Sequence, residues 1–129
     1  MAEILFKNES YAIIGVCMKV HAALGYGFLE AVYQEAIEKE FKKREIPFKS
    51  QQKLSVYFDG QKLDKYYIAD FLCYEKIIME LKVCQFISDF QIKQLQNYLK
   101  ATNNKLGILV NFGSTSLTYE RIINSTGSL

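Results

Sequence analysis

The chain has 129 residues, 50% of them hydrophobic, which is enough for one compact domain over residues 1–129 with a core of its own. Nine tyrosines, nine phenylalanines and a single proline, with no low-complexity tract, argue against a disordered chain. The net charge of +2 is too small to indicate nucleic-acid binding by itself, so any such binding requires local clusters of basic residues.

Helical periodicity dominates the first third of the chain. Residues 9–24 place apolar side chains at helical spacing, and the paired glycines of Gly25-Tyr26-Gly27 then predict a tight turn. A second helix is expected from about Phe28 to Arg44, stopped by Pro47. The first helix is expected to bury Ile13, Val16, Cys17, Val20 and Leu24. The second is expected to bury Leu29, Val32, Tyr33, Ala36, Ile37 and Phe41.

From Phe48 onward the apolar pattern changes to a period of two, which is typical of strands. Strands are predicted over residues 54–58, 63–74 and 77–83, with Asp59-Gly60 as the hairpin turn between the first two. Ser88-Asp89 predicts the start of a helix over residues 89–101 that turns Ile92, Leu95 and Leu99 inward. Strands over 105–112 and 116–123 complete an α/β fold in the order α-α-β-β-β-α-β-β.

In the hairpin IADFLCYEKIIMELKV, residues 68–83, three charged residues lie inside the apolar strands, outside the polar turn. If its turn is centred on Glu75, Asp70 faces Glu80 across the hairpin and Lys82 shares their side. The same register pairs Leu72 with Ile78 and Ile68 with Lys82. Opposed carboxylates destabilise a sheet, and near an apolar core one has its pKa raised unless a cation lies between them. The pattern therefore indicates a site for a divalent ion, whereas a solvated strand face is the alternative.

These charged residues resemble a known motif. Asp70, followed by Glu80-Leu81-Lys82 on the adjacent strand, resembles the core of the PD-(D/E)XK nuclease superfamily, with Ala69 in place of the proline that names it. The segment GFLEAVY, residues 27–33, resembles the motif of the GxxExxY family. The resemblance covers roughly residues 8–124, including HAALGYG at 21–27 and VNFG at 110–113.

The resemblance implies a restriction-endonuclease-like core, in which a mixed central β-sheet is flanked by helices. It implies that Asp70, Glu80 and the backbone carbonyl of Leu81 ligate a metal ion. It also implies that Glu30 supports this ion directly or through water. Lys82 would orient or activate the attacking water and stabilise charge on the phosphate.

A further motif follows on the predicted third helix. Gln94-Leu-Gln-Asn-Tyr98 resembles the Q-x-x-x-Y motif of the exonuclease-type branch, which contacts the substrate or braces the site. Both side chains lie on one helix face, because they are four residues apart. An exposed surface role for Glu30 and a core role for Tyr98 are the alternatives.

The chemistry expected of these residues is metal-dependent hydrolysis of phosphodiester bonds, with DNA as the favoured substrate. Hard oxygen ligands select Mg²⁺ or Mn²⁺ over zinc, and no cluster of histidine and cysteine competes. The alternative is a non-catalytic module of the same fold that binds nucleic acid or protein. A homodimer, or a protein partner that supplies specificity, is compatible with so short a chain.

The remaining signals are less specific. His21, the only histidine, is expected to lie on the helix surface or to make a structural hydrogen bond. A basic strip beside the site is one interpretation of several lysines, and a solvated face of mixed charge is the other. The residues concerned are Lys42, Lys43, Arg44, Lys49, Lys53, Lys93 and Lys100.

The cysteines and the N-terminus bear on the compartment. Cys17, Cys73 and Cys84 are widely spaced among apolar neighbours, so buried, reduced thiols are expected. The N-terminus lacks the pattern of a secretory signal, and no segment reaches the ~18 apolar residues of a membrane span. The expected location is therefore the cytoplasm, with no membrane attachment.

Overall fold

The computed structural model describes residues 4–124 of the chain. Its elements follow one another as α1 (Lys7–Leu24), α2 (Glu30–Lys43), β1 (Phe48–Phe58), β2 (Gln61–Cys73), β3 (Ile77–Lys82), α3 (Asp89–Thr102), β4 (Leu106–Asn111) and β5 (Thr118–Ile123). The predicted order of helices and strands, and the α/β class, are confirmed.

One mixed sheet organises the described part of the chain. Its strands lie in the order β1-β2-β3-β4-β5, and all neighbours are antiparallel except β3 and β4, which are parallel. A parallel pair needs a crossover connection, and α3 supplies it between these two strands. All six residues of β4 are buried, as expected for a strand covered on both faces.

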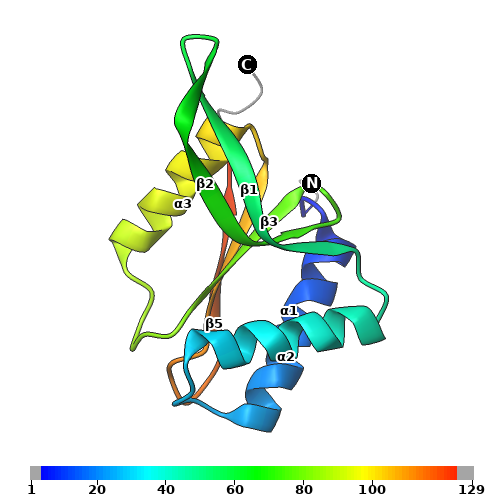
Figure 1. Ribbon diagram of the computed structural model, residues 1–129. Helices are drawn as coiled ribbons and strands as arrows, with labels where there is room; N and C mark the ends of the chain where they lie inside the picture. The colour runs from blue at the N-terminus through cyan, green and yellow to red at the C-terminus, as the bar shows by residue number, and fades with distance from the viewer. Residues whose placement is uncertain (1–3, 125–129) are drawn as a thin grey trace.

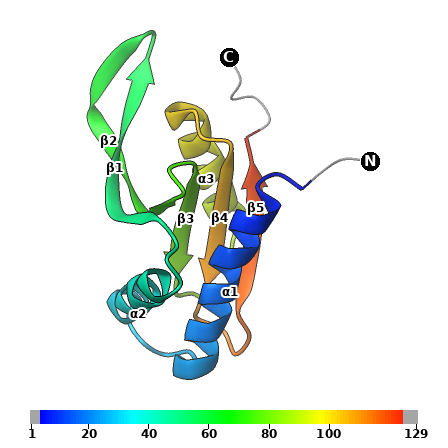
Figure 2. The ribbon, with the colours of Figure 1, turned by 90° about the vertical axis from the view of Figure 1, so that its right-hand side faces the viewer.

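Helices cover both faces of this sheet. The core on one side contains residues of α1 and α2, and the core on the other side contains residues of α3, as the two ribbon views show (Figures 1 and 2). Gly107 of β4 lies directly under α3, where an added Cβ would come within 2.9 Å of Leu95 Cδ2. Its missing side chain lets the helix pack closely on the strand. The predicted Ser88 cap is also confirmed, since Ser88 Oγ accepts a hydrogen bond from Gln91 N.

The hairpin of β1 and β2 extends beyond the other strands of the sheet. Only residues 71–73 of β2 pair with β3, so the remainder of the hairpin projects beyond the other strands (Figure 1). Its turn contains Asp59 at φ 53° and Gly60 at φ 76°, as the hairpin signal in the sequence predicts.

The loop between α1 and α2 is held by a buried tyrosine. Gly25 and Gly27 have φ of 73° and 108°, which glycine adopts without steric penalty. Tyr33 Oη donates to Gly25 O at 2.6 Å and accepts from Phe28 N at 3.4 Å. The hydroxyl therefore fixes the approach of the chain to the start of α2.

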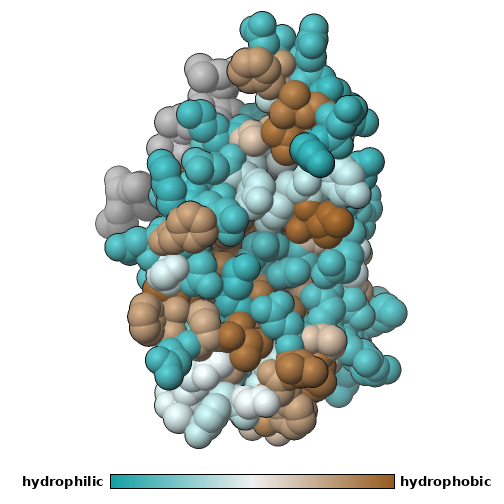
Figure 3. All heavy atoms as spheres, turned by 60° about the vertical axis from the view of Figure 1, so that its left-hand side comes forward, coloured by the Kyte–Doolittle hydropathy of each residue, from teal (hydrophilic) through white to brown (hydrophobic). Residues whose placement is uncertain are grey.

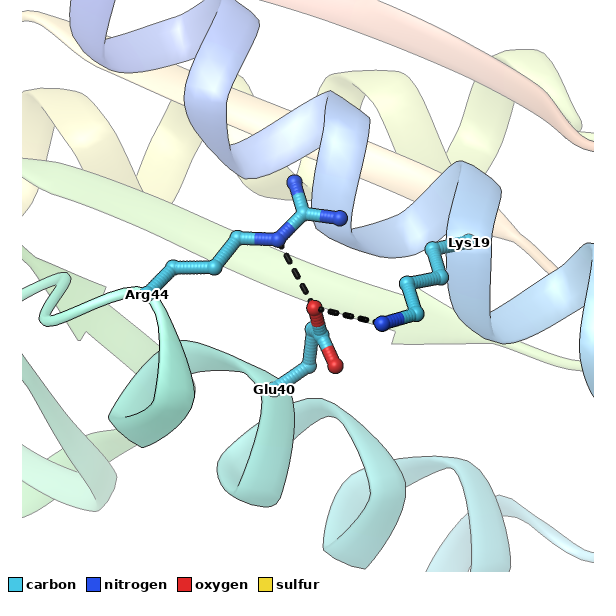
Figure 4. Close-up of polar contacts among 3 residues, drawn as sticks. All are labelled: Lys19, Glu40 and Arg44. Carbon is cyan, nitrogen blue, oxygen red and sulfur yellow. Dashed lines mark hydrogen bonds and ion pairs between the residues drawn. The ribbon is translucent and has the colours of Figure 1, made fainter.

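An ion-pair cluster joins the two helices farther along. Glu40 of α2 accepts from Arg44 Nε at 2.8 Å and from Lys19 Nζ of α1 at 3.1 Å (Figure 4). The Arg44 hydrogen bond, with a further contribution from Lys19, lowers the pKa of Glu40.

Two expectations for side-chain burial were wrong. Leu29 is 78% exposed and Val32 39% exposed, because α2 begins only at Glu30 and its first turn extends past the edge of the core. Cys17 and Cys73 are buried as expected, but Cys84 is partly exposed, since it follows the end of β3.

The structural role expected for His21 is confirmed by one contact. His21 is buried, and its Nε2 lies 3.0 Å from Ser114 O, which gives this ring a structural hydrogen bond. Within residues 4–124, no helix combines the length and the hydropathy that crossing a bilayer requires.

Candidate active site

Two carboxylates lie where β2 and β3 separate. The backbone ladder pairs Leu72 with Ile78, as predicted, but ends at Phe71 and Met79, so Ile68 and Lys82 are not paired. Beyond that point side chains replace the ladder. Asp70 N donates to Glu80 Oε2 at 2.8 Å, and Leu81 N donates to Asp70 Oδ2 at 2.8 Å. Each carboxylate therefore accepts a backbone N–H from the opposite strand.

The electrostatics of this pair are unfavourable to two negative charges. Burial, with a further contribution from the neighbouring Asp70 charge, raises the pKa of Glu80 to about 7. Burial also raises the pKa of Asp70, although the hydrogen bonds from Leu81 N and Gln51 oppose this. At neutral pH the site therefore favours either a proton on Glu80 or an additional cation.

Lys82 supplies a positive charge near both acids. It lies two residues after Glu80 on β3 and therefore on the same side of the strand. Its charge lowers the pKa of each carboxylate, but less than burial raises it. Within the described part of the chain, Lys82 makes no direct ion pair, so its ammonium group is available to a ligand.

The structure brings the predicted helix residues to this site. A small hollow is lined by Glu80 and Lys82 from β3 and by Gln94 and Tyr98 from α3. Gln91, whose Oε1 accepts from Ser88 N in the helix cap, lines the same hollow. Two of the predicted catalytic residues, Glu80 and Lys82, thus share one surface with the predicted substrate contacts, whereas Asp70 and Glu30 do not line it.

Tyr98 is held in place by Tyr67, a residue that sequence reasoning did not single out. The two rings stack with centroids 3.8 Å apart and planes 9° apart. Tyr67 is 6% exposed, and its hydroxyl lies beside Glu80 but meets no acceptor in hydrogen-bonding geometry among the described residues. Burial, with the nearby charges of Glu80 and Asp70, raises the pKa of Tyr67. The alternation of β2 gave no sign that this tyrosine differs from a core residue.

Gln51 and Gln34 are two further contacts of Asp70 that the sequence did not indicate. Gln51 Nε2 donates to Asp70 Oδ1 at 3.4 Å, and its backbone has a φ of 49°, which is uncommon outside glycine. Gln34 Nε2 of α2 donates to Asp70 O at 3.3 Å. Asp70 is therefore held from three elements, β1, β3 and α2.

Glu30 does not join the two acids. It is exposed in the first turn of α2, one helical turn before Gln34. Among residues 4–124 there is no group of three histidine, cysteine, aspartate or glutamate side chains placed to hold a metal ion. The metal role predicted for Glu30 remains a prediction.

The donor set fits a hard divalent cation. Asp70 and Glu80 provide carboxylate oxygens whose raised pKa values indicate a demand for positive charge. Lys82 O accepts from Phe112 N on the β4 side, so the preceding residue, Leu81, directs its N–H and C=O toward β2. The Leu81 carbonyl therefore lies on the same side as Asp70, where the ladder has ended.

Comparisons with known proteins bear on the fold and the family of the chain. Among solved structures, the crystal structure of SSO0001 matches with a TM-score of 0.56 and 17% sequence identity over 72% of this chain, a likeness of fold. The chain spans half the length of that protein. None of the curated proteins compared with the chain matches it. The sequence profile of the PD-(D/E)XK nuclease superfamily matches residues 7–122, which include the two acids, Lys82 and all of the secondary structure except the final residue of β5. The chain belongs to the PD-(D/E)XK nuclease superfamily.

Proposed function

We propose that the protein is a metal-dependent nuclease that hydrolyses phosphodiester bonds in nucleic acid, with DNA as the favoured substrate. The observation that carries the proposal is the joint placement of Asp70, Glu80 and Lys82. Two partly buried acids with raised pKa values lie beside an unpaired lysine, at a break in the sheet. Such a set of perturbed groups in a hollow is typical of a reactive site.

Each residue of the site would have a separate role in hydrolysis. Asp70, Glu80 and the Leu81 carbonyl would hold Mg²⁺ or Mn²⁺, with Glu30 contributing through water. When bound, the ion would act as a Lewis acid on the phosphoryl oxygen. Lys82 would orient the attacking water and stabilise the negative charge that develops on the phosphate.

Two side chains of α3 would position the substrate. Gln94 and Tyr98 line the same hollow as Glu80 and Lys82. Stacking on Tyr67 fixes the ring of Tyr98, so that its position does not depend on a bound ligand. This arrangement supports a role in orienting the scissile phosphate.

The test is cleavage of labelled single- and double-stranded DNA and RNA in Mg²⁺, Mn²⁺ or EDTA. We expect metal-dependent cleavage that Lys82→Met abolishes and that Lys39→Met, a change of an exposed lysine on α2, leaves unchanged. Asp70→Asn keeps an oxygen for Leu81 N and removes the charge, so it should abolish cleavage without unfolding the chain. Cleavage retained by both Lys82→Met and Asp70→Asn would refute the proposal.

The second candidate is a non-catalytic module that binds nucleic acid or protein. One observation favours it, because Asp70 and Glu80 both accept backbone N–H groups and therefore have a structural use without catalysis. Thermal unfolding with and without Mg²⁺ separates the two. The nuclease should be stabilised by the ion, and Asp70→Asn should remove most of that stabilisation.

Assignment within the superfamily, partners and compartment are part of the proposal as well. Gly27, Glu30 and Tyr33 support membership of the GxxExxY family. A homodimer or a protein partner would add specificity to a chain of this length. Three free cysteines suit the reducing cytoplasm.

A further inference from the structure

The projecting part of the β1–β2 hairpin, residues 52–69, forms an arm that is anchored on one side only. Leu54 and Tyr67 are paired across the hairpin, and both pack into the core beneath α3. Ala69 and Val56 belong to the same core. The arm is therefore a fixed extension of the sheet, and its inner side is already occupied.

The outer side of the arm is exposed and carries a cation against an aromatic ring. Lys53 pairs with Ile68 and Ser55 with Tyr66, so these four side chains share the side opposite the core. Tyr66 is 50% exposed and Ile68 47% exposed. Lys53 Nζ lies 4.3 Å from the centroid of the Tyr66 ring.

A second lysine extends this surface toward the tip of the arm. Lys53 and Tyr66 line a hollow together with Lys62, Leu63 and Asp64. Within the described part of the chain, neither Lys53 nor Lys62 forms an ion pair with a carboxylate. Seen from the side of the arm and α3, the molecule is mainly hydrophilic, with separate hydrophobic side chains rather than one continuous apolar patch (Figure 3). Two lysines without a carboxylate partner among the described residues, beside an exposed ring, suit a polyanion better than an apolar protein partner.

The outer side of the arm leads to the acid pair. Tyr66, Ile68 and Asp70 are alternate residues of β2, and Gln51, which donates to Asp70 Oδ1, lies two residues before Lys53 on β1. Four residues of extended strand span about 13 Å.

We propose that the outer side of the arm binds an unpaired strand of nucleic acid and leads it to Asp70. The inference rests on the proposed nuclease function and names its substrate as single-stranded, or frayed, nucleic acid. An exposed base stacks on Tyr66, while Lys53 and Lys62 contact the phosphates on either side. A tyrosine ring beside lysines is the combination that binds single strands without reading sequence, because every unpaired base offers a flat face. Bases inside a duplex are stacked on each other and cannot use the ring.

The test is binding of a fluorescently labelled single strand, and of a duplex of equal length, to the full chain in EDTA, where no metal-dependent cleavage occurs. Tyr66→Ala should weaken single-strand binding about five-fold or more and leave duplex binding unchanged. Tyr66→Phe, which keeps the ring, should bind almost as tightly as the wild type. The double variant Lys53→Gln/Lys62→Gln should reduce the slope of log K against log salt by about 1.4.

The matched control removes two charges elsewhere. Lys39→Gln/Lys105→Gln changes two exposed lysines, one on α2 and one just before β4, and should leave the salt slope for the single strand almost unchanged. Single-strand binding that survives Tyr66→Ala, or that falls equally in the control, would overturn the arm proposal, provided that circular dichroism shows the variants folded. Cleavage by the wild type is measured separately. A strand bound by the arm but never cut would overturn the nuclease proposal alone.

Discussion

Replacing Glu80 by glutamine should stabilise the protein at alkaline pH, although it should abolish metal-dependent activity. The amide keeps an oxygen that can accept the hydrogen bond from Asp70 N, and it removes the charge that burial disfavours. The effect should therefore depend on pH, because the wild-type carboxyl can escape the penalty by binding a proton.

The size of the effect follows from the pKa of Glu80. Its ordinary value is 4.5, and burial together with the Asp70 charge raises it to about 7 in the folded chain. At about 1.4 kcal/mol per pKa unit, the ionised side chain lowers the free energy of unfolding by about 3 kcal/mol above pH 7. The folded state binds more protons than the unfolded state between pH 4.5 and 7, so wild-type stability falls as pH rises through that window and levels off above it.

The assay is urea unfolding of the wild type and Glu80→Gln in EDTA, at pH values from 4.5 to 8.5. The variant should gain about 3 kcal/mol over the wild type at pH 8 and show little difference at pH 4.5. The raised pKa of Asp70 contributes a slope of the same sign to both proteins, so the difference between them isolates Glu80. A difference that is constant across pH, or that favours the wild type at pH 8, would refute the reasoning.

Three further outcomes are expected. Gly113→Ala should destabilise the fold by about 2 kcal/mol or more in urea unfolding, because its Cβ would overlap the backbone of Cys84. As a control, Gly15→Ala inside α1 meets only the tip of an arginine and should be neutral or stabilising by up to about 1 kcal/mol. Equal effects of the two substitutions would contradict this prediction. Tyr33→Phe should lower the free energy of unfolding by about 1–2 kcal/mol, because it leaves Gly25 O without its donor, and faster exchange of the neighbouring amides would locate the loss. A thiol reagent should modify Cys84 quickly in the native protein and the other two cysteines only on unfolding, so three fast thiols would show that the core is open.

The fold could be predicted from the sequence because most of its signals are local. The apolar period changes from helical to strand-like at Phe48, Asp59-Gly60 marks the hairpin, and Ser88 marks the start of α3. The register of the hairpin also follows from its turn, which is why the pairing of Leu72 with Ile78 could be predicted.

The parts that could not be predicted depend on where the sheet ends. A strand pattern does not show that the ladder stops at Phe71, and the contacts of Gln51, Gln34 and Tyr67 with the acid pair exist only because it does. Burial at the start of α2 was overestimated for the same reason. Helical periodicity predicts that Leu29 points inward but does not show that α2 begins only after it.

The hydrogen bonds between the acid pair and the opposing backbone have a consequence for the evolution of such sites. If the proposed nuclease activity were lost in a descendant, oxygen acceptors would still be needed at positions 70 and 80 to satisfy two peptide groups. Drift there would be confined to acids and amides, so an intact pair of acids is a poor marker of activity. The side chain of Lys82 makes no such hydrogen bond to the backbone of residues 4–124, so only selection for catalytic activity would keep it. Among relatives of this chain, the residue at the position of Lys82 should therefore distinguish active nucleases from inactive ones.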